Sequence, residues 1–340
     1  MAGSAQPAGR HMSVRVRICV SIAVLFLQAR SARAEEQRTT EGTPSALESP
    51  RALDGHVFQP SRLLTGPFTV TAFGTVTAFG SGSVDAPKYD LQGNQTGTRK
   101  YTVAAFGQGF NTDLRLTPDI ALRFEFEGLF FAGTTGRGLL VAGATAQGSL
   151  AAGVTAGKTL SRTSRLSFVL DAGIAPQFSL LVGNAVRNAV VTQTFNDNGL
   201  FSSVNRVDVN PGLSYAFSPA PPFGFIAEAR YLWSRRVSND TEAGNRTAQG
   251  ISLGALASMD LEPMLRWPFA LQLAFRGDLP IGSNGITRVY QTSFGVYYSR
   301  RVRLALGLEG IWRHGDVRPG VEPTLKADSG VANIVFRYYW

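Results

Sequence analysis

The sequence of 340 residues has one cysteine, three histidines and no long apolar run. A helix that crosses a bilayer needs about 18 or more consecutive apolar residues, and no stretch approaches that length, so a helical membrane protein is excluded. Charged residues make up 17% of the chain, below the ~25% that is usual for soluble domains, whereas the hydrophobic fraction of 44% is ordinary. The many Phe, Val, Leu and Ile residues exclude disorder for most of the chain.

The first 34 residues have the features of a secretory signal peptide. Arg10, Arg15 and Arg17 form a positive region, residues 18–27 are apolar, and residues 32–34 (Ala-Arg-Ala) offer the small side chains that a signal peptidase reads. The apolar run is too short to cross a bilayer. We therefore expect export, with cleavage after Ala34.

Removal of this leader changes the composition. Five arginines leave with it, so 28 Lys and Arg face 24 Asp and Glu and the net charge falls from +9 to +4. The apparent basicity then gives no argument for nucleic-acid binding. Cys19, the only cysteine, also leaves. Without a thiol and with few histidines, a transition-metal site is not expected, and we expect no cofactor.

The rest of the chain divides into a short aperiodic segment and a long alternating one. Residues 35–65 are polar and contain proline, which predicts a flexible periplasmic segment or a plug. Residues 66–340 alternate apolar and polar side chains with a period of two, the pattern of strands between two different environments. In residues 119–130, for example, Ile, Leu and Phe alternate with Arg and Glu.

The alternating region predicts an all-β, antiparallel transmembrane β-barrel of about 12 strands with up-and-down topology. The expected strands lie near residues 66–80, 100–116, 119–133, 138–158, 165–182, 200–217, 223–237, 247–261, 267–280, 286–299, 301–314 and 328–340. Most match or exceed the ~9–11 residues that a tilted strand needs to cross a bilayer. Long and short connections alternate, as in outer-membrane barrels with long extracellular loops and short periplasmic turns. A soluble β-sandwich has no reason to separate its loops in this way.

The carboxyl-terminal residues carry the most specific signal. In the final SGVANIVFRYYW, Phe336, Tyr338 and Trp340 alternate with polar residues, and the chain stops on the aromatic residue. This segment resembles the terminal strand by which bacterial outer-membrane barrels are recognised by their insertion machinery. The resemblance implies a location in the bacterial outer membrane, with outer-membrane lipid and that machinery as partners. Residues 66–340 loosely resemble the broad set of bacterial transporter-like barrels, which includes proteins linked to the uptake of aromatic compounds.

If the apolar stripe faces lipid, the opposite side chains line the lumen. The candidates among them are charged residues of both signs, with every cation an arginine: Arg123, Glu125, Glu127, Asp171, Arg206, Asp208, Glu228, Arg230, Arg276, Asp278, Glu309, Arg313 and Arg337. Arginine pairs with carboxylates through two parallel hydrogen bonds. These residues could form a paired network that fills a narrow barrel, or a polar constriction through which a small solute passes. Balanced signs argue against strong ion selectivity in both cases.

Three functions from different classes are compatible with this barrel. The leading hypothesis is a passive, porin-like channel or transporter for an unknown small solute. The second is a structural or adhesive barrel with a closed lumen, whose outer loops at 81–99 and 183–199 bind a partner. The third is an outer-leaflet hydrolase that uses His314 as its base. No serine signature accompanies His314, so we do not expect an enzyme.

Overall fold

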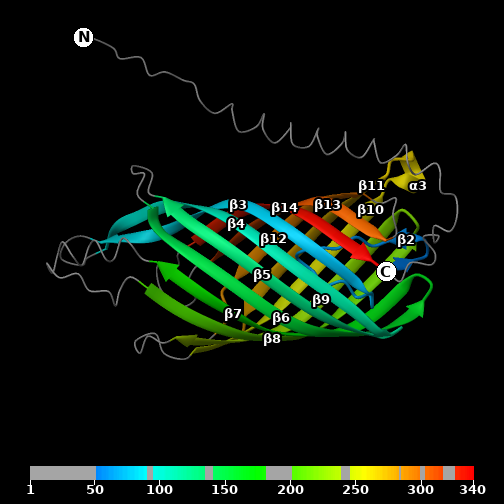
Figure 1. Ribbon diagram of the computed structural model, residues 1–340, viewed down its shortest axis with the longest axis horizontal. Helices are drawn as coiled ribbons and strands as arrows, with labels where there is room; N and C mark the ends of the chain where they lie inside the picture. The colour runs from blue at the N-terminus through cyan, green and yellow to red at the C-terminus, as the bar shows by residue number, and fades with distance from the viewer. Residues whose placement is uncertain are drawn as a thin grey trace, which may run out of the picture. The chain divides into compact units, whose positions relative to one another are not determined.

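The computed structural model describes residues 51–89, 95–134, 141–180, 201–238, 246–282, 285–298, 303–316 and 326–340, all within the compact unit Ser45–Trp340. Twelve antiparallel strands pair in chain order, and the last pairs with the first to close a barrel (Figure 1). The barrel strands are β3 (Ala72–Tyr89), β4 (Gln95–Thr117), β5 (Ile120–Thr134), β6 (Val141–Ser161), β7 (Ser164–Leu180), β8 (Phe201–Ala220), β9 (Phe223–Ser238), β10 (Arg246–Asp260), β11 (Phe269–Pro280), β12 (Val289–Tyr298), β13 (Leu304–Asp316) and β14 (Lys326–Tyr339).

The predicted fold class and strand number are confirmed. The alternation of connections is also present: residues 118–119, 162–163 and 221–222 are two-residue turns at one end, whereas residues 181–200 join β7 to β8 at the other end. The turn between β10 and β11 contains the short helix α3 (Glu262–Leu265). No helix in the described ranges is long and apolar enough to cross a membrane. We refer to the end with the short turns as the periplasmic end, following the expectation from the sequence.

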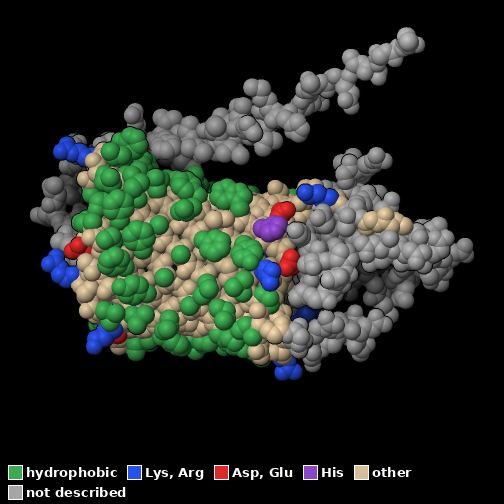
Figure 2. Space-filling view, turned by 180° about the vertical axis from the view of Figure 1, so that it is seen from behind, with side chains coloured by type: hydrophobic (Ala, Val, Ile, Leu, Met, Phe, Trp, Pro, Cys, Tyr) green, Lys and Arg blue, Asp and Glu red, His purple; other side chains and the backbone are tan. Residues whose placement is uncertain are grey.

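The two faces of each strand meet different surroundings, as the alternating pattern requires. In β5, Phe124, Phe126 and Phe130 point outward with about half of their surface exposed, whereas Arg123 and Glu125 point into the lumen. Hydrophobic side chains cover the middle of the outer surface in the view of Figure 2, and charged side chains gather towards its ends. In hydrocarbon this arrangement is stable because the closed sheet pairs its backbone groups without leaving an edge.

The first strand differs from its prediction at both ends. We expected it at 66–80, but β3 runs from Ala72 to Tyr89, and residues 66–71 belong to the segment before the barrel. The expected loop at 81–99 is wrong, because β3 and β4 continue as a paired hairpin as far as Tyr89 and Gln95. The sequence hides this extension because Ser, Gly, Asp and Lys lie there on both faces, so the apolar alternation stops before the pairing does. The second proposed partner loop, 183–199, lies outside the described residues.

Residues 51–71 enter the barrel. We call them the lumenal segment. They begin with two short paired strands, β1 (Ala52–Leu53) and β2 (His56–Val57), at the end of the barrel where β3 starts (Figure 1). Most of the lumenal segment is buried, although only β1 and β2 are regular secondary structure. The fold thus places an aperiodic stretch of chain inside a regular wall.

Candidate functional site in the lumen

The lumenal segment starts with a tight hairpin under the periplasmic turns. Asp54 and Gly55 join β1 to β2 with φ angles of 47° and 85°. Two consecutive residues with positive φ form the turn type that Asp-Gly favours in two-residue hairpins. The Asp54 amide donates to the carbonyl of Arg162, in the turn between β6 and β7, over 3.0 Å. The hairpin is therefore attached to the rim of the barrel through its own turn.

His56 anchors the other strand of this hairpin. Its Nδ1 is 3.1 Å from the Pro221 carbonyl and its Nε2 is 2.7 Å from the Ser258 hydroxyl, and its ring edge contacts Phe58. A carbonyl can only accept, so Nδ1 carries the proton and Nε2 accepts from Ser258. Burial lowers the pKa of His56 from 6.5 to about 4, with Arg51 acting in the same direction and the bond to Pro221 opposing it. His56 is therefore neutral at pH 7.

This burial predicts that acid releases the hairpin. A released hairpin binds a proton at His56 as the pH falls below 6.5, whereas the seated one binds it only near pH 4. The free energy that holds the hairpin in the barrel, which we call the seating free energy, is thus largest above pH 6.5. It falls between pH 6.5 and 4, by on the order of 3 kcal/mol in total. Hydrogen exchange of residues 52–58, corrected for intrinsic rates, should accelerate over this range. His56→Gln does not titrate, so its exchange should not change with pH; equal pH dependence in both proteins would contradict this assignment.

Arg62 makes the deepest charged contacts of the lumenal segment. Its guanidinium donates to Glu125 and Glu127 of β5, over 2.9 Å each, and its backbone amide donates to Glu309 of β13 over 3.1 Å. The Glu309 carboxylate also accepts from the hydroxyl of Tyr297, which is fully buried. Three wall carboxylates from two well-separated strands therefore bind one residue of the segment.

The part of the lumenal segment from Thr65 to Pro67, which we call the return limb, is bound mainly through its backbone. The Thr65 amide donates to Glu228 over 3.0 Å, and its hydroxyl accepts from Arg123 over 3.1 Å. The Pro67 carbonyl accepts from Arg165 and Ser167, over 2.9 and 2.6 Å. Polar residues of the wall thus bond backbone groups that water would otherwise solvate.

Apolar side chains of the segment fill the space between these polar contacts. Leu53, Phe58, Leu63 and Leu64 are each at most 5% exposed and pack against lumen-facing residues of the wall. These wall residues are small or aliphatic: Ala216, Ile226, Leu256 and Ala274. The periplasmic half of the lumen therefore has a small hydrophobic core of its own, half of it supplied by the segment.

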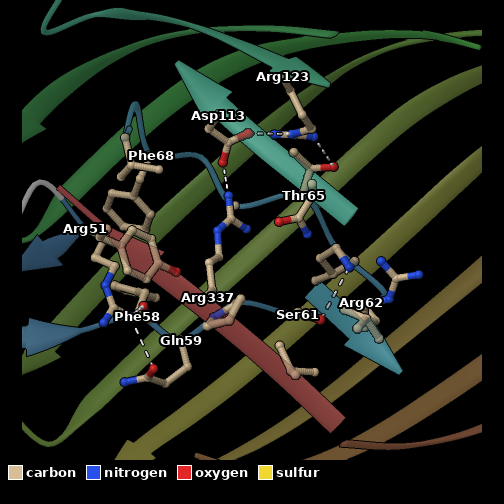
Figure 3. A pocket seen from close by; sticks show the side chains of 18 of the residues that line it. Arg51, Phe58, Gln59, Ser61, Arg62, Thr65, Phe68, Asp113, Arg123 and Arg337 are labelled. Carbon is tan, nitrogen blue, oxygen red and sulfur yellow. Dashed lines mark hydrogen bonds and ion pairs between the residues drawn. The ribbon is translucent and has the colours of Figure 1, made fainter. Parts of the chain in front are cut away.

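The wall carries a continuous arc of alternating charges beside the return limb. We call it the charge arc; it consists of Glu228, Arg230, Asp171, Arg123, Asp113 and Arg337. Arg230 donates to Asp171 over 2.5 Å and to Glu228 over 3.1 Å, and Arg123 lies 3.5 Å from Asp171 and 3.4 Å from Asp113. Arg337 pairs with the other oxygen of Asp113. The arc links β9, β7, β5, β4 and β14, and Figure 3 shows its Arg123–Asp113–Arg337 part facing Thr65.

A polar cavity of about 140 Å³ separates part of the segment from the wall (Figure 3). Arg51, Arg62, Asp113, Arg123 and Arg337 are among its lining residues. The Arg51 guanidinium lies 4.2 Å from the centre of the Tyr339 ring and donates to the Phe58 carbonyl. The space is large enough for several small polar molecules of the size of water. The segment thus occupies this part of the lumen without filling it completely.

The remaining lumen candidates lie outside the charge arc, four of them in local pairs. Arg206 lies 2.8 Å from Asp208, and Arg276 lies 2.9 Å from Asp278 and also donates to the Leu63 carbonyl. Arg313 shares the lumen-facing register of β13 with Glu309. The structure thus brings six of the thirteen predicted residues into contact with the lumenal segment, namely Arg123, Glu125, Glu127, Glu228, Arg276 and Glu309.

Two residues that organise this site were missed at the sequence level. Asp113 has the alternating position of a lumen residue in β4, so the period of two could have identified it. Arg62 stands in an aperiodic stretch, where no pattern indicates the direction of its side chain. Its role depends on the whole segment entering the barrel.

His314, the base of the hydrolase hypothesis, has no hydrogen bond to a serine in the described part of the chain. Its Nδ1 bonds to Asp328, and both side chains are more than half exposed on the outer face of the barrel. No group of three His, Cys, Asp or Glu that could hold a metal occurs among the residues that the structure describes. Phe336, Tyr338 and Trp340 also point outward, with the Tyr338 and Trp340 rings stacked 5.9 Å apart.

Comparison with known proteins yields structural neighbours but no relative by sequence. No family model and no curated protein matches the chain. The translocator domain of the autotransporter NalP from Neisseria meningitidis is 8% identical over 94% of this chain and 98% of its own, with a TM-score of 0.49. An outer membrane channel from Pseudomonas putida F1 is 12% identical over 83% of this chain and 100% of its own, also with a TM-score of 0.49. The P. putida toluene transporter TodX is 10% identical over 88% of this chain and 94% of its own, with a TM-score of 0.39. These likenesses concern the barrel fold alone.

Proposed function

We propose that this protein is a passive channel for small solutes in the bacterial outer membrane, closed at its periplasmic half by the lumenal segment. One observation carries the proposal: the lumenal segment lies inside the barrel, is continuous with the wall at Ala72, and is otherwise held by hydrogen bonds, ion pairs and apolar packing. Those contacts can open without any change in the barrel hydrogen bonds. A closure of this kind is a gate.

The chemistry of the wall supports small polar solutes as the cargo. Arginines and carboxylates alternate along the charge arc, and both signs line the cavity beside the segment. A lumen with both signs at short range does not favour one ion type strongly. A small solute that carries donors and acceptors can replace the contacts of the segment as it passes.

A structural barrel with a permanently closed lumen is the second candidate. The paired charge arc favours it, because a connected arginine–carboxylate network stiffens the wall. In that case the segment would be a constant part of the core. The two functions differ in whether the segment leaves its place while the barrel stays folded.

Weakening one contact of the segment tests the channel. Arg62→Ala removes both side-chain bonds to β5 and leaves Glu125 and Glu127 without that partner. These carboxylates are about one-third and one-quarter exposed, so we expect a loss of only about 2 kcal/mol in seating, equivalent to about thirtyfold more frequent opening. Single-channel conductance of the refolded protein in a planar bilayer measures this frequency.

The matched control is Arg162→Ala. Arg162 also pairs with an acidic residue, Asp54, but over 3.8 Å and with a side chain that is 86% exposed. This variant should open as rarely as the unchanged protein. If Arg62→Ala is folded, as shown by heat-dependent mobility on gels, and still as silent as the control, the gate is contradicted and the structural barrel is favoured.

A further inference from the structure

A row of polar side chains faces outward near the outer end of the barrel. The cross-strand register places Tyr290, His314, Asp328, Ser83 and Thr102 side by side on β12, β13, β14, β3 and β4. They have the outward parity of their strands, in contrast to Glu309 and the other lumen residues. We call this set the outer row. It is unrelated to the contacts of the lumenal segment.

The outer row lines a shallow groove of about 500 Å³ on the outer surface. Lys100, on the same face of β4 as Thr102, also lines the groove, as does Trp312 on β13. The bond from His314 Nδ1 to Asp328 fixes the imidazole and leaves its Nε2 available at the groove. Lys100 thus offers a donor nitrogen at this site, His314 offers a second one in its imidazolium form, and Asp328 is already engaged by His314.

The groove lies directly above the apolar belt. Four residues further along each strand towards the periplasmic end, the register aligns Phe294, Gly310, Ala332, Phe79 and Phe106. The Phe79 and Phe106 rings lie 5.3 Å apart and are about half exposed. The change from aromatic to polar rows therefore marks the boundary between hydrocarbon and headgroups.

Trp312 occupies that boundary, between the two kinds of row. It is 56% exposed, and its indole lies beside the glycine positions 310 and 330, where the absence of side chains gives it room. An aromatic face in this position can cover a sugar ring or the first carbons of an acyl chain. A lipid whose chains pack on Phe79 and Phe106 would hold its headgroup against Trp312 and the outer row.

We propose that the outer row and Lys100 bind the phosphorylated headgroup of a glycolipid in the outer leaflet. The Lys100 ammonium donates to phosphate oxygens, and His314 does so from Nε2 in its imidazolium form, in which both ring nitrogens are donors, while the hydroxyls of Ser83 and Thr102 complete the anion site. Trp312 contacts the sugar. Asp328 is a positioning residue that acts through His314. This inference requires the outer-membrane orientation used above, and it does not depend on whether the lumen conducts.

Lipid binding to the whole mature protein in detergent tests the proposal. The probe is a bis-phosphorylated diglucosamine lipid, titrated and followed by native mass spectrometry, with its dephosphorylated form as the second arm. Lys100→Gln and His314→Gln should each weaken binding of the phosphorylated form about tenfold, the effect of one lost charge-assisted bond. Lys158→Gln is the matched control, because Lys158 is an exposed lysine at the periplasmic end of β6. It should bind like the unchanged protein.

Three outcomes would overturn the proposal. The first is equal binding of the phosphorylated and dephosphorylated lipids. The second is unchanged binding by folded Lys100→Gln and His314→Gln. The third is displacement of the lipid by inorganic phosphate at the same phosphate concentration, which would assign the groove to a free anion. None of these readouts uses conductance, so they are separate from the test of the channel.

Discussion

A chain that begins at Thr71 is expected to conduct almost continuously, whereas the mature protein opens rarely. The deletion removes the apolar side chains at Leu53, Phe58, Leu63 and Leu64, which make half of the lumenal core. It also removes the residues that bond Glu125, Glu228 and Ser167. A seating free energy of about 3 kcal/mol keeps a gate closed for about 99% of the time, so its loss raises the open fraction about a hundredfold.

The control for this deletion is a chain that begins at Ser45. It keeps the lumenal segment, and it should open as rarely as the mature protein. Conductance in planar bilayers and flux into liposomes of defined volume measure both chains, after circular dichroism has shown equal strand content. If the chain that begins at Thr71 is folded and closed, the wall side chains alone close the lumen, and the channel is refuted.

Arg230→Met is expected to destabilise the barrel by about 3–5 kcal/mol. The side chain of Arg230 is 6% exposed, that of Glu228 is 3% exposed and that of Asp171 is 18% exposed. Methionine preserves much of the volume of arginine, but it leaves Glu228 without its cation and Asp171 with Arg123 alone, 3.5 Å away, in a poorly solvated place. The free energy of unfolding in urea, measured in detergent micelles or thin bilayers, gives the cost.

Arg206→Met is the matched control for this effect. Arg206 has the same kind of bond, 2.8 Å to Asp208, but it is 52% exposed, so its loss should cost under about 1 kcal/mol. Combining Arg230→Met with Asp171→Asn and Glu228→Gln should recover most of the stability, because no buried charge is then left unpaired. If Arg230→Met costs no more than Arg206→Met, Arg230 does not have the role that the charge arc gives it.

The amino-acid sequence by itself determines the barrel. A period of two is a local property, so each stretch such as residues 119–130 shows which side chains face lipid and which face the lumen before any partner strand is known. The alternation of connection lengths then predicts the direction of the barrel in the membrane. The charged faces could be predicted for the same reason, as Arg123 and Glu228 illustrate.

Only the tertiary structure decides which of those charges meet, and which part of the chain lies in the lumen. Asp171 contacts Arg230 and Arg123 because strands that are distant in sequence come together when the barrel closes, and the register that brings them together is set by all the strands at once. The path of residues 51–71 cannot be predicted from the local sequence, because an aperiodic segment takes its conformation from the walls that it packs against. The place of Arg62 between Glu125 and Glu127 therefore depends on the folded barrel, because its partners belong to the wall and not to the segment.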